Sequence, residues 1–460
     1  MARTDARSLR HYVDSAPADQ FLFDRADRVR VADLVASTSL GGRAAALSGR
    51  SVLVATASQL ASALALLELD GRARRITILP PDVDAAHLDA LLNGAEIDAV
   101  VVDGQSRQIF PDVPLRVVCT PHLAPGDDGL PAPLCTEWVL LTSGTTGAPK
   151  MVVHSLAGLA AAIAAPRGAD PVVWGTFYDI RRYGGLQILL RAVLGGGSLV
   201  LSSAGERVAE HLERLARRGV THLSGTPSHW RRALMSPAIG KISPRYVRLS
   251  GEIADQAILD YLRTAFPQAA IGHAYASTEA GVGFAVDDGL AGFPARYFAG
   301  CGNGVELKVL DGTLRIRSPG CASRYLGARR AALCEADGFV DTGDVVERRG
   351  ERYFFVGRKG GIINVGGLKV HPEEVEAVIN RHPQVRMSLV RPKRSPVTGA
   401  IVIADVVLKA ACRRPEEELE ARDDILRLCR GALPRHKVPA AISFVPALAV
   451  AATGKLARRG

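Results

Sequence analysis

The stretch "LLTSGTTGAPK", residues 140–150, is dominated by glycine and small hydroxyl side chains. Such residues bury little apolar surface and cannot build a core. Because glycine permits positive φ and close backbone approach, the stretch can bring several N–H groups and hydroxyls to one anion. Its spacing differs from the Gly-x-x-x-x-Gly-Lys-Ser/Thr loop, since Ala148 and Pro149 separate Gly147 from Lys150. We interpret it as a phosphate-binding loop of another kind, with a flexible surface loop as the alternative.

The chain has 460 residues, which is too long for one hydrophobic core and predicts two or three domains. Apolar runs at 51–57, 98–104, 196–203 and 220–227 are bounded by turn residues and are typical of buried strands. The stretches 59–71, 87–96 and 209–219 have the spacing of helices. This alternation favours an α/β fold with mainly parallel sheets.

The pattern changes after Gly300, where apolar runs become shorter and charged turns more frequent. Residues 305–318 predict a hairpin with its turn at Asp311 and Gly312. A last compact α/β segment follows Arg358 and contains a helix over 371–383. The C-terminal part is therefore expected to differ in architecture from the rest.

Composition narrows the class of protein. Almost all of the net charge of +10 lies after residue 356, as either a solvated basic face or a surface for a polyanionic molecule or acidic protein. Nucleic acid is not expected, because interleaved aromatics and recognition-helix or zinc-finger patterns are missing from the sequence. The seven cysteines lack CxxC spacing, and no run of about 18 apolar residues or signal-peptide core occurs. We expect a cytoplasmic protein without disulfides or membrane contact.

Four further stretches follow the glycine-rich loop at long intervals: "YASTEAG" (275–281), "DGFVDTGDVVE" (337–347), "GRKGGIINVGGLKVHPEEVEAVI" (357–379) and "ATGKLARRG" (452–460). Taken in this order, the five stretches resemble the adenylate-forming (AMP-binding) enzyme superfamily, which includes acyl- and aryl-CoA synthetases, adenylation domains of peptide synthetases, and luciferases. The resemblance covers the chain from about Glu137 onward and is closest to the acyl/aryl-CoA synthetases. The first 130 residues match only loosely.

The resemblance implies a fold and a reaction. A large N-terminal domain, residues 1–357, would contain mainly parallel sheets flanked by helices plus a small β-barrel-like part, and residues 358–460 would form a small mobile α/β domain. The reaction joins a carboxylic acid to the α-phosphate of ATP, releases pyrophosphate, and passes the acyl group to a thiol. Because two anions meet in the first step, positioning and charge neutralisation are expected to dominate. ATP, Mg²⁺ and coenzyme A are the implied cofactors.

The same resemblance assigns residues to the nucleotide and the metal. The β- and γ-phosphates are expected on Thr142, Ser143, Gly144, Thr145, Thr146, Gly147 and Lys150. Thr278 is expected at the α-phosphate and Glu279 on Mg²⁺, a cation that prefers oxygen ligands. The adenosine is expected near Ser250, Gly251, Glu252, Tyr275, Asp344 and Arg358, with Tyr275 on adenine and the last two on ribose. Lys455 would reach the acid and the α-phosphate. Without the resemblance, Asp344 would be interpreted as a turn residue and Lys455 as a solvated lysine of the C-terminal segment.

The remaining assignments concern the acid, the thiol and the hinge. Phe177, His229 and Gly281 are expected to line the acid pocket, although a core aromatic and a structural histidine are the commoner cases. Gly366 and Gly367 would border the path by which the thiol reaches the acyl-adenylate. Gly360 occupies the hinge position, where relatives usually carry Asp or Lys, so rotation remains possible without a side chain that locks one state.

Three functions remain open from the sequence. The first is an acid–CoA ligase, favoured by the segment around Gly366 and by a basic C-terminal region that suits the phosphates of coenzyme A. The second is a stand-alone adenylating enzyme that loads an acyl carrier protein, since an acidic carrier would also suit a basic face. The third is a non-catalytic relative, which the presence of Lys150, Glu279, Asp344 and Lys455 argues against. The sequence does not name the acid.

Overall fold

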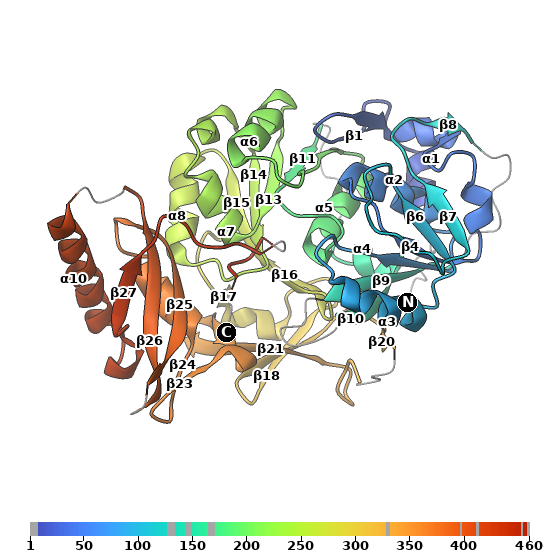
Figure 1. Ribbon diagram of the computed structural model, residues 1–460. Helices are drawn as coiled ribbons and strands as arrows, with labels where there is room; N and C mark the ends of the chain where they lie inside the picture. Colours follow the sequence, from blue (N-terminus) through green and yellow to red (C-terminus); the bar gives the residue numbers. More distant parts are fainter. Residues whose placement is uncertain are drawn as a thin grey trace.

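The chain folds into two unequal parts, and the smaller C-terminal part, orange to red in Figure 1, lies beside the larger one. The computed structural model describes residues 8–126, 134–142, 149–163, 171–327, 332–395, 398–410, 414–451 and 454–457. The mixed α/β architecture with a small C-terminal domain confirms the predicted fold class. Within the described ranges, no helix combines the length and the apolar character needed to cross a bilayer.

The first sheet of the large part has seven strands and carries the glycine-rich stretch at one edge. Its order is β20 (Arg324–Leu326), β10 (Lys150–Ser155), β9 (Glu137–Thr142), β5 (Arg75–Ile78), β4 (Ser51–Val54), β6 (Ala99–Val102) and β7 (Leu115–Val118). The strands from β9 to β7 pair in parallel, whereas β9–β10 and β10–β20 are antiparallel. The antiparallel pairing of β9 with β10 therefore places Thr142 and Lys150, which flank the glycine-rich stretch, opposite one another.

The second sheet has eight strands and supplies most of the loops around the site. Its order is β16 (Gly281–Val286), β15 (Ala270–Ser277), β14 (Tyr246–Ser250), β13 (His222–Gly225), β11 (Val173–Thr176), β12 (Ser198–Val200), β1 (Phe21–Phe23) and β2 (Arg28–Arg30). The strands from β15 to β1 pair in parallel, so their carboxyl ends share one edge, where ligands bind in open α/β sheets.

The helices of the large part fill the space between and around these sheets. They are α1 (Leu9–Asp14), α2 (Gln59–Leu69), α3 (Leu88–Gly94), α4 (Leu156–Ala160), α5 (Tyr183–Leu194), α6 (Val208–Arg217), α7 (Pro227–Ala233) and α8 (Gln256–Ala265). Helix α2 begins at Ser58, whose hydroxyl accepts from two backbone N–H groups, and is buried almost throughout. It shares one core with α5 and strands of both sheets, which makes the large part a single packed body.

The predicted β-barrel-like part is a five-stranded antiparallel sheet. Its order is β17 (Phe293–Pro294), β22 (Arg352–Arg358), β21 (Val340–Arg349), β19 (Thr313–Arg317) and β18 (Glu306–Leu310). The turn between β18 and β19 has positive φ at Asp311 (51°) and Gly312 (74°), which confirms the hairpin predicted there. This sheet brings the 337–347 and 357–358 stretches of sequence side by side.

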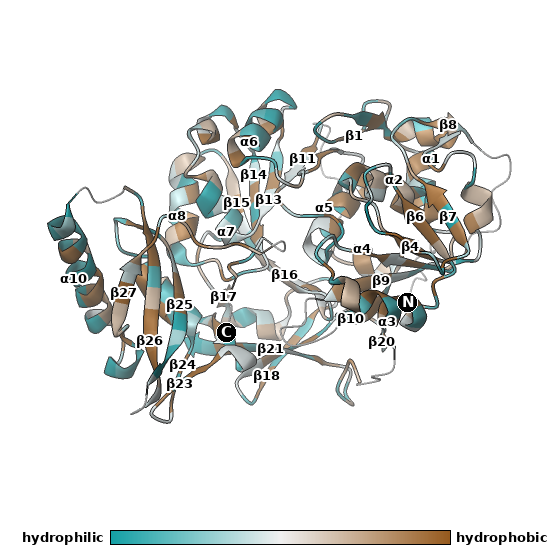
Figure 2. Cartoon of the chain, viewed as in Figure 1, coloured by the Kyte–Doolittle hydropathy of each residue, from teal (hydrophilic) through white to brown (hydrophobic). Residues whose placement is uncertain are grey.

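The small part has its own core. Strands β25 (Val385–Ser395), β26 (Gly399–Leu408) and β27 (Ala441–Phe444) form one sheet, and β23 (Ile363–Val365) and β24 (Leu368–Val370) a two-stranded ribbon. Helices α9 (Pro372–Ile379) and α10 (Pro415–Ala432) pack against them around Val375, Val406 and Ile425. Figure 2 shows apolar colour along β25 and β26 and hydrophilic segments on the outer helix α10.

The two parts meet through α7 and α8 of the large part. Asp255, the N-cap of α8, accepts from Arg231 of α7 at 2.5 Å and from Asn380 of the small part at 3.2 Å. Arg231 also donates to the backbone oxygen of Arg386 at 3.1 Å. This orientation brings residues 454–457 back to the large part, where they enter the site described below.

Candidate active site

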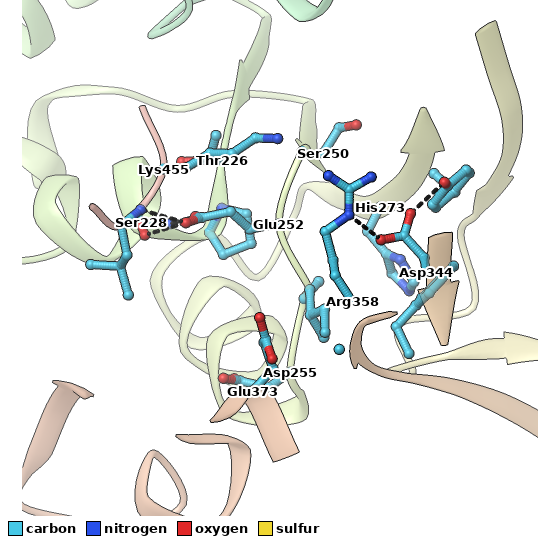
Figure 3. Close-up of a pocket in the computed structure, with 18 of the residues that line it drawn as sticks. Thr226, Ser228, Ser250, Glu252, Asp255, His273, Asp344, Arg358, Glu373 and Lys455 are labelled. Carbon is cyan, nitrogen blue, oxygen red and sulfur yellow. Dashed lines mark hydrogen bonds and ion pairs between the residues drawn. The ribbon is translucent and has the colours of Figure 1, made fainter. Parts of the chain in front are cut away.

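A cavity of about 1650 Å³ lies where the two parts meet. This is larger than a typical single-ligand pocket of roughly 300–1000 Å³, so its volume would accommodate more than one small molecule. Its wall contains many of the residues predicted for the site: Thr142, Lys150, Ser250, Gly251, Glu252, Tyr275, Thr278, Glu279, Asp344, Arg358 and Lys455. Figure 3 shows Ser250, Asp344, Arg358 and Lys455 around one space. Segments more than 300 residues apart in sequence thus converge here.

The β9–β10 pair contributes to the cavity wall two of the residues predicted for the phosphates. Thr142 ends β9 and Lys150 begins β10, and the two are direct partners in the ladder. The predicted phosphate ligands between them lie outside the described residues (Ser143, Gly144, Thr145, Thr146 and Gly147). The Lys150 ammonium lies 5.2 Å from the ring centroid of Tyr325 on β20. Lys150 therefore points along the same wall as the groups that follow.

Thr278 and Glu279 follow β15 at its carboxyl end. The backbone oxygen of Thr278 accepts from Nε2 of His154 at 2.8 Å, and burial lowers the pKa of His154 to about 4, so this imidazole is a neutral donor. Glu279 Oε1 accepts from the Tyr325 hydroxyl at a long 3.5 Å. Burial, with the charge of Glu279 adding to it, raises the pKa of Tyr325 to about 12. Tyr325 was not predicted from the sequence.

The site fits a magnesium ion in the way that nucleotide enzymes hold one. Mg²⁺ is commonly bound by one or two carboxylates together with substrate phosphates rather than by a full protein cage. Among the described residues, no group of three or more His, Cys, Asp or Glu side chains forms such a cage. Glu279 lines the cavity, and among the described residues its carboxylate accepts one long hydrogen bond, so oxygen lone pairs on it could hold a metal that carries phosphate.

Asp344 and Arg358 form the best-defined pair of the site. They are direct partners on the antiparallel strands β21 and β22, and Asp344 Oδ1 accepts from Arg358 Nε at 2.9 Å. The other carboxylate oxygen accepts from the Tyr275 hydroxyl at 2.6 Å. The charge of Asp344 raises the pKa of Arg358. A carboxylate held in this way faces the cavity as a fixed acceptor, which suits the vicinal hydroxyls of a ribose.

Tyr275 belongs to an aromatic stack. Its ring lies 5.0 Å from that of Phe355, at 11°, and 5.7 Å from that of Phe284, at 23°. All three side chains line the cavity. Stacking of Tyr275 on adenine stays a prediction, whereas its hydrogen bond to Asp344 is an additional feature that the sequence did not indicate.

Lys455 enters the cavity from the C-terminal segment, next to the turn that follows β14. That turn contains Ser250 and Gly251, and Gly251 has φ of 88°. A Cβ atom at Gly251 would lie 3.5 Å from Cε of Lys455, so the turn passes close under the lysine stem. Lys455 is exposed to the cavity and enclosed by protein beyond it; burial lowers its pKa, while Glu252 raises it. An anion in the cavity would stabilise the ammonium form.

The residues predicted for the acid pocket lie behind the cavity wall. Phe177 and His229 stack on one another at 5.7 Å, and His229 completes a capping box with Thr226 at the start of α7. Gly281, with φ of 73°, packs against the backbone of Gly320, where a Cβ would lie 2.3 Å from its oxygen. Their contact with substrate stays a prediction.

Other side chains stand on the wall at the N-terminus of α5. Tyr178, Arg182, Tyr183 and Gly184 line the cavity there. The Tyr178 hydroxyl donates to the backbone oxygen of Ser250 at 2.8 Å, and burial raises its pKa. Arg182 pairs with Asp82. Asp179 and Gly185 of the same stretch also line the cavity.

The hinge and thiol residues lie away from the cavity in this orientation. Gly360 is exposed in the short turn Lys359–Gly361, with open space around its Cα. Gly366 and Gly367 form the exposed turn of the β23–β24 ribbon, with φ of 57° and 85°. Their roles stay predictions.

Comparison with known proteins identifies the family. The sequence-family model described as AMP-binding enzyme matches residues 48–326. The family model described as AMP-binding enzyme C-terminal domain matches residues 374–455. The chain belongs to the AMP-binding enzyme family, the adenylate-forming class to which the five sequence stretches pointed.

The curated relatives include CoA ligases and a nonribosomal peptide synthase. The chain is 28% identical to 4-coumarate–CoA ligase 2 of Oryza sativa subsp. japonica over 349 residues, which cover 69% of this chain and 60% of the ligase. It is 26% identical to a dimodular nonribosomal peptide synthase of Bacillus subtilis over 443 residues, covering 83% of this chain and 18% of the synthase. The matched region is thus about three fifths of the plant ligase and less than a fifth of the synthase.

Solved structures show the same fold over nearly the whole chain. An anthranilate CoA ligase in complex with anthranoyl-AMP has a TM-score of 0.82 at 16% identity, covering 99% of this chain and 97% of the ligase. A benzoate CoA ligase from Burkholderia xenovorans has 0.81 at 20%, covering 98% of each chain. An amide bond synthetase from Marinactinospora thermotolerans has 0.78 at 20%, covering 97% of each. These likenesses concern the fold alone.

Proposed function

We propose that this chain is an ATP-dependent acid–thiol ligase that activates a carboxylic acid as an acyl-adenylate and transfers the acyl group to coenzyme A. The observation that carries the proposal is the convergence of Lys150, Glu279, the Asp344–Arg358 pair and Lys455 on one cavity. A non-catalytic role would not require a tail lysine and a distant carboxylate to meet. The family and the named CoA ligases among its relatives support this reading.

The first half-reaction joins two anions. A carboxylate oxygen of the acid attacks the α-phosphorus of ATP, the bond to the bridging oxygen of the β-phosphate breaks, and pyrophosphate leaves. Asp344 would hold the ribose, Thr278 and Lys150 would contact phosphate oxygens, and Lys455 would offset the repulsion between acid and phosphate. Glu279 would hold Mg²⁺, which supplies charge neutralisation on the phosphates when bound. Fixed charges of this kind act strongly in an enclosed site.

The second half-reaction requires a thiol to reach the acyl carbon. The thiol sulfur, as its thiolate, forms a bond to the carbonyl carbon, the bond to the AMP oxygen breaks, and AMP leaves. In the present orientation Lys455 fills part of the cavity and the Gly366–Gly367 turn lies outside it. We propose that residues 358–460 rotate about Gly360 after the first step, which withdraws Lys455 and brings the turn to the thiol path.

The proposed function and its alternative differ only in the molecule that accepts the acyl group. A basic C-terminal part suits the phosphates of coenzyme A, but it equally suits an acidic acyl carrier protein, and peptide synthases are among the relatives. The aromatic wall formed by Tyr178 and Tyr183 favours an aryl or acyl acid of moderate size. The proposal therefore leaves the identity of the acid to experiment.

The proposed function is tested by acid-dependent release of pyrophosphate from ATP and Mg²⁺. A panel of benzoates, cinnamates and aliphatic acids should give release with at least one class, and coenzyme A should then yield a thioester and AMP. Acyl transfer to a carrier protein with no transfer to coenzyme A would favour the alternative. Absence of acid-dependent pyrophosphate release and of adenylate across the panel would reject both.

A bulky residue in the β23–β24 turn should separate the two half-reactions. Gly367→Val should slow thioester formation by about 10-fold or more while acyl-adenylate formation changes little, because the turn is remote from the cavity in the present orientation. The measurement is pyrophosphate exchange beside thioester formation from pre-made acyl-adenylate. Gly312→Val is the control, since it has a similar φ of 74° and equally open surroundings in the β18–β19 turn. Equal loss of both steps in Gly367→Val would contradict the assignment.

A further inference from the structure

The segment that carries Lys455 is fastened to the large part on both sides of that residue. Before it, the backbone oxygen of Gly454 accepts from the Thr226 hydroxyl at 2.6 Å, and this bond is buried. After it, the backbone N–H of Leu456 donates to Glu252 Oε1 at 2.8 Å. Figure 3 shows Thr226, Glu252 and Lys455 close together on one side of the cavity. The lysine is thus anchored by its own neighbours.

The two anchors come from rigid positions. Thr226 is the N-cap of α7, and its hydroxyl oxygen also accepts from the N–H of His229 at 3.0 Å. Glu252 accepts from the N–H of Ser228 at 2.8 Å and from its hydroxyl at 3.0 Å. Each anchor is therefore oriented by α7 whether or not residues 454–456, here called the tail, are docked. A pre-oriented partner loses little side-chain entropy when the tail docks.

Gly454 fits this place because it has no side chain. Its φ is 75°, a conformation that favours glycine, and a Cβ there would lie 1.9 Å from Cε1 of the His229 ring. The backbone of the tail thus packs directly against the His229 ring. This gives His229 a contact with Gly454 that the sequence did not suggest.

We propose that Thr226 and Glu252, with the His229 ring beneath Gly454, form a latch that holds the Lys455 segment in the cavity for adenylate formation and releases it for thioester formation. The proposal rests on the proposed function, because it assigns Lys455 to the first half-reaction. Thr226 and Glu252 are positioning residues: they touch the backbone beside Lys455. Rotation of the small part would break both tail bonds while leaving the α7 capping bonds in place.

The first test uses the Thr226 hydroxyl. Thr226→Val removes the donor to Gly454 at almost constant volume, and Thr226→Ser keeps it. We expect Thr226→Val to lower the rate of acid-dependent pyrophosphate exchange by about 10-fold, because it loses the buried bond to Gly454 in addition to the N-cap bond from His229, and Thr226→Ser, which keeps both bonds, to retain the rate. Thioester formation from pre-made acyl-adenylate should remain within about twofold in both. Equal loss in both half-reactions would assign Thr226 to the stability of α7 alone.

The second test acts from the tail and leaves α7 unchanged. Gly454→Ala places a methyl group against His229 and should reproduce the selective loss of pyrophosphate exchange. Gly49→Ala is the control, because Gly49 has a φ of 71° with open surroundings far from the cavity. A loss of exchange in Gly454→Ala equal to that in Gly49→Ala would overturn the latch.

A third readout needs no activity. The protease Lys-C cleaves after lysine and needs a free backbone on both sides, which the latch denies at Lys455. Cleavage after Lys455, followed by intact mass, should be slow in the unaltered chain and at least 5-fold faster in Thr226→Val and Gly454→Ala. Unchanged cleavage would reject the latch even if adenylation is found. Faster cleavage without adenylation by the unaltered chain would support the latch and reject the proposed function.

Discussion

Replacing Lys455 with alanine should lower the rate of acyl-adenylate formation by about 10²- to 10³-fold, the usual effect of losing one preorganised charge contact. Lys455 lines the cavity together with Asp344 and Arg358, and in the proposed function its ammonium offsets repulsion between the acid and the α-phosphate. Thioester formation from pre-made acyl-adenylate should persist, because that step no longer joins two anions. Pyrophosphate exchange and a single-turnover thiol reaction measure the two steps separately.

The control for this variant is Lys241→Ala. Lys241 is exposed on the large part and pairs with Glu213 at 2.7 Å, so its loss changes net charge equally without altering the cavity. Both half-reactions should remain close to those of the unaltered chain. Adenylation at a near-normal rate in Lys455→Ala would show that Lys455 has no role in that step. It would also remove the reason for proposing domain rotation.

Replacing Asp344 with alanine should raise the KM for ATP by about 10²-fold, because charge-assisted hydrogen bonds to the ribose are each worth roughly 1.5–3 kcal/mol. The change also leaves Arg358 and the Tyr275 hydroxyl without their shared acceptor. Unlike Lys455→Ala, this variant should weaken both half-reactions, since the acyl-adenylate carries the same ribose. Initial rates at varied ATP and at varied acyl-adenylate are the measurement.

Glu347→Ala provides the matched control on the same strand. Glu347 is exposed and is not among the residues that line the cavity, although its partner Arg349, at 2.6 Å, is. Its loss should leave the KM for ATP within about twofold. If Asp344→Ala alters the maximal rate with an unchanged KM for ATP, the ribose assignment is wrong.

The resemblance to the family predicted that Asp344 and Arg358 contact the same ribose, and the structure adds that the two side chains pair directly. Asp344 and Arg358 are 14 residues apart on neighbouring antiparallel strands, so a short stretch of chain suffices to bring them together. The hairpin at Asp311 and Gly312 was predicted for the same reason, because positive φ at both residues is a local requirement. In such cases the residue types and their spacing contain the geometry.

Contacts between distant segments were not predicted. Thr226 meets Gly454 across 228 positions and Glu252 meets Leu456 across 204, and both depend on how the small part docks. Tyr325 reaches Glu279 because β20 joins the edge of the first sheet, which no periodicity indicates. The packing of the His229 ring against Gly454 was not predicted either, since it depends on the capping box that fixes the direction of the ring at the start of α7.

The central claim is that a carboxylate oxygen of the acid attacks the α-phosphate of ATP in this cavity. Isotope transfer tests it most directly, with an accepted acid carrying ¹⁸O in both carboxylate oxygens, ATP, Mg²⁺ and a thiol acceptor. We expect one ¹⁸O atom in the AMP produced and none in the pyrophosphate, because the carboxylate oxygen stays on phosphorus when the thiol attacks. ADP with labelled phosphate, or unlabelled AMP formed together with thioester, would contradict the account.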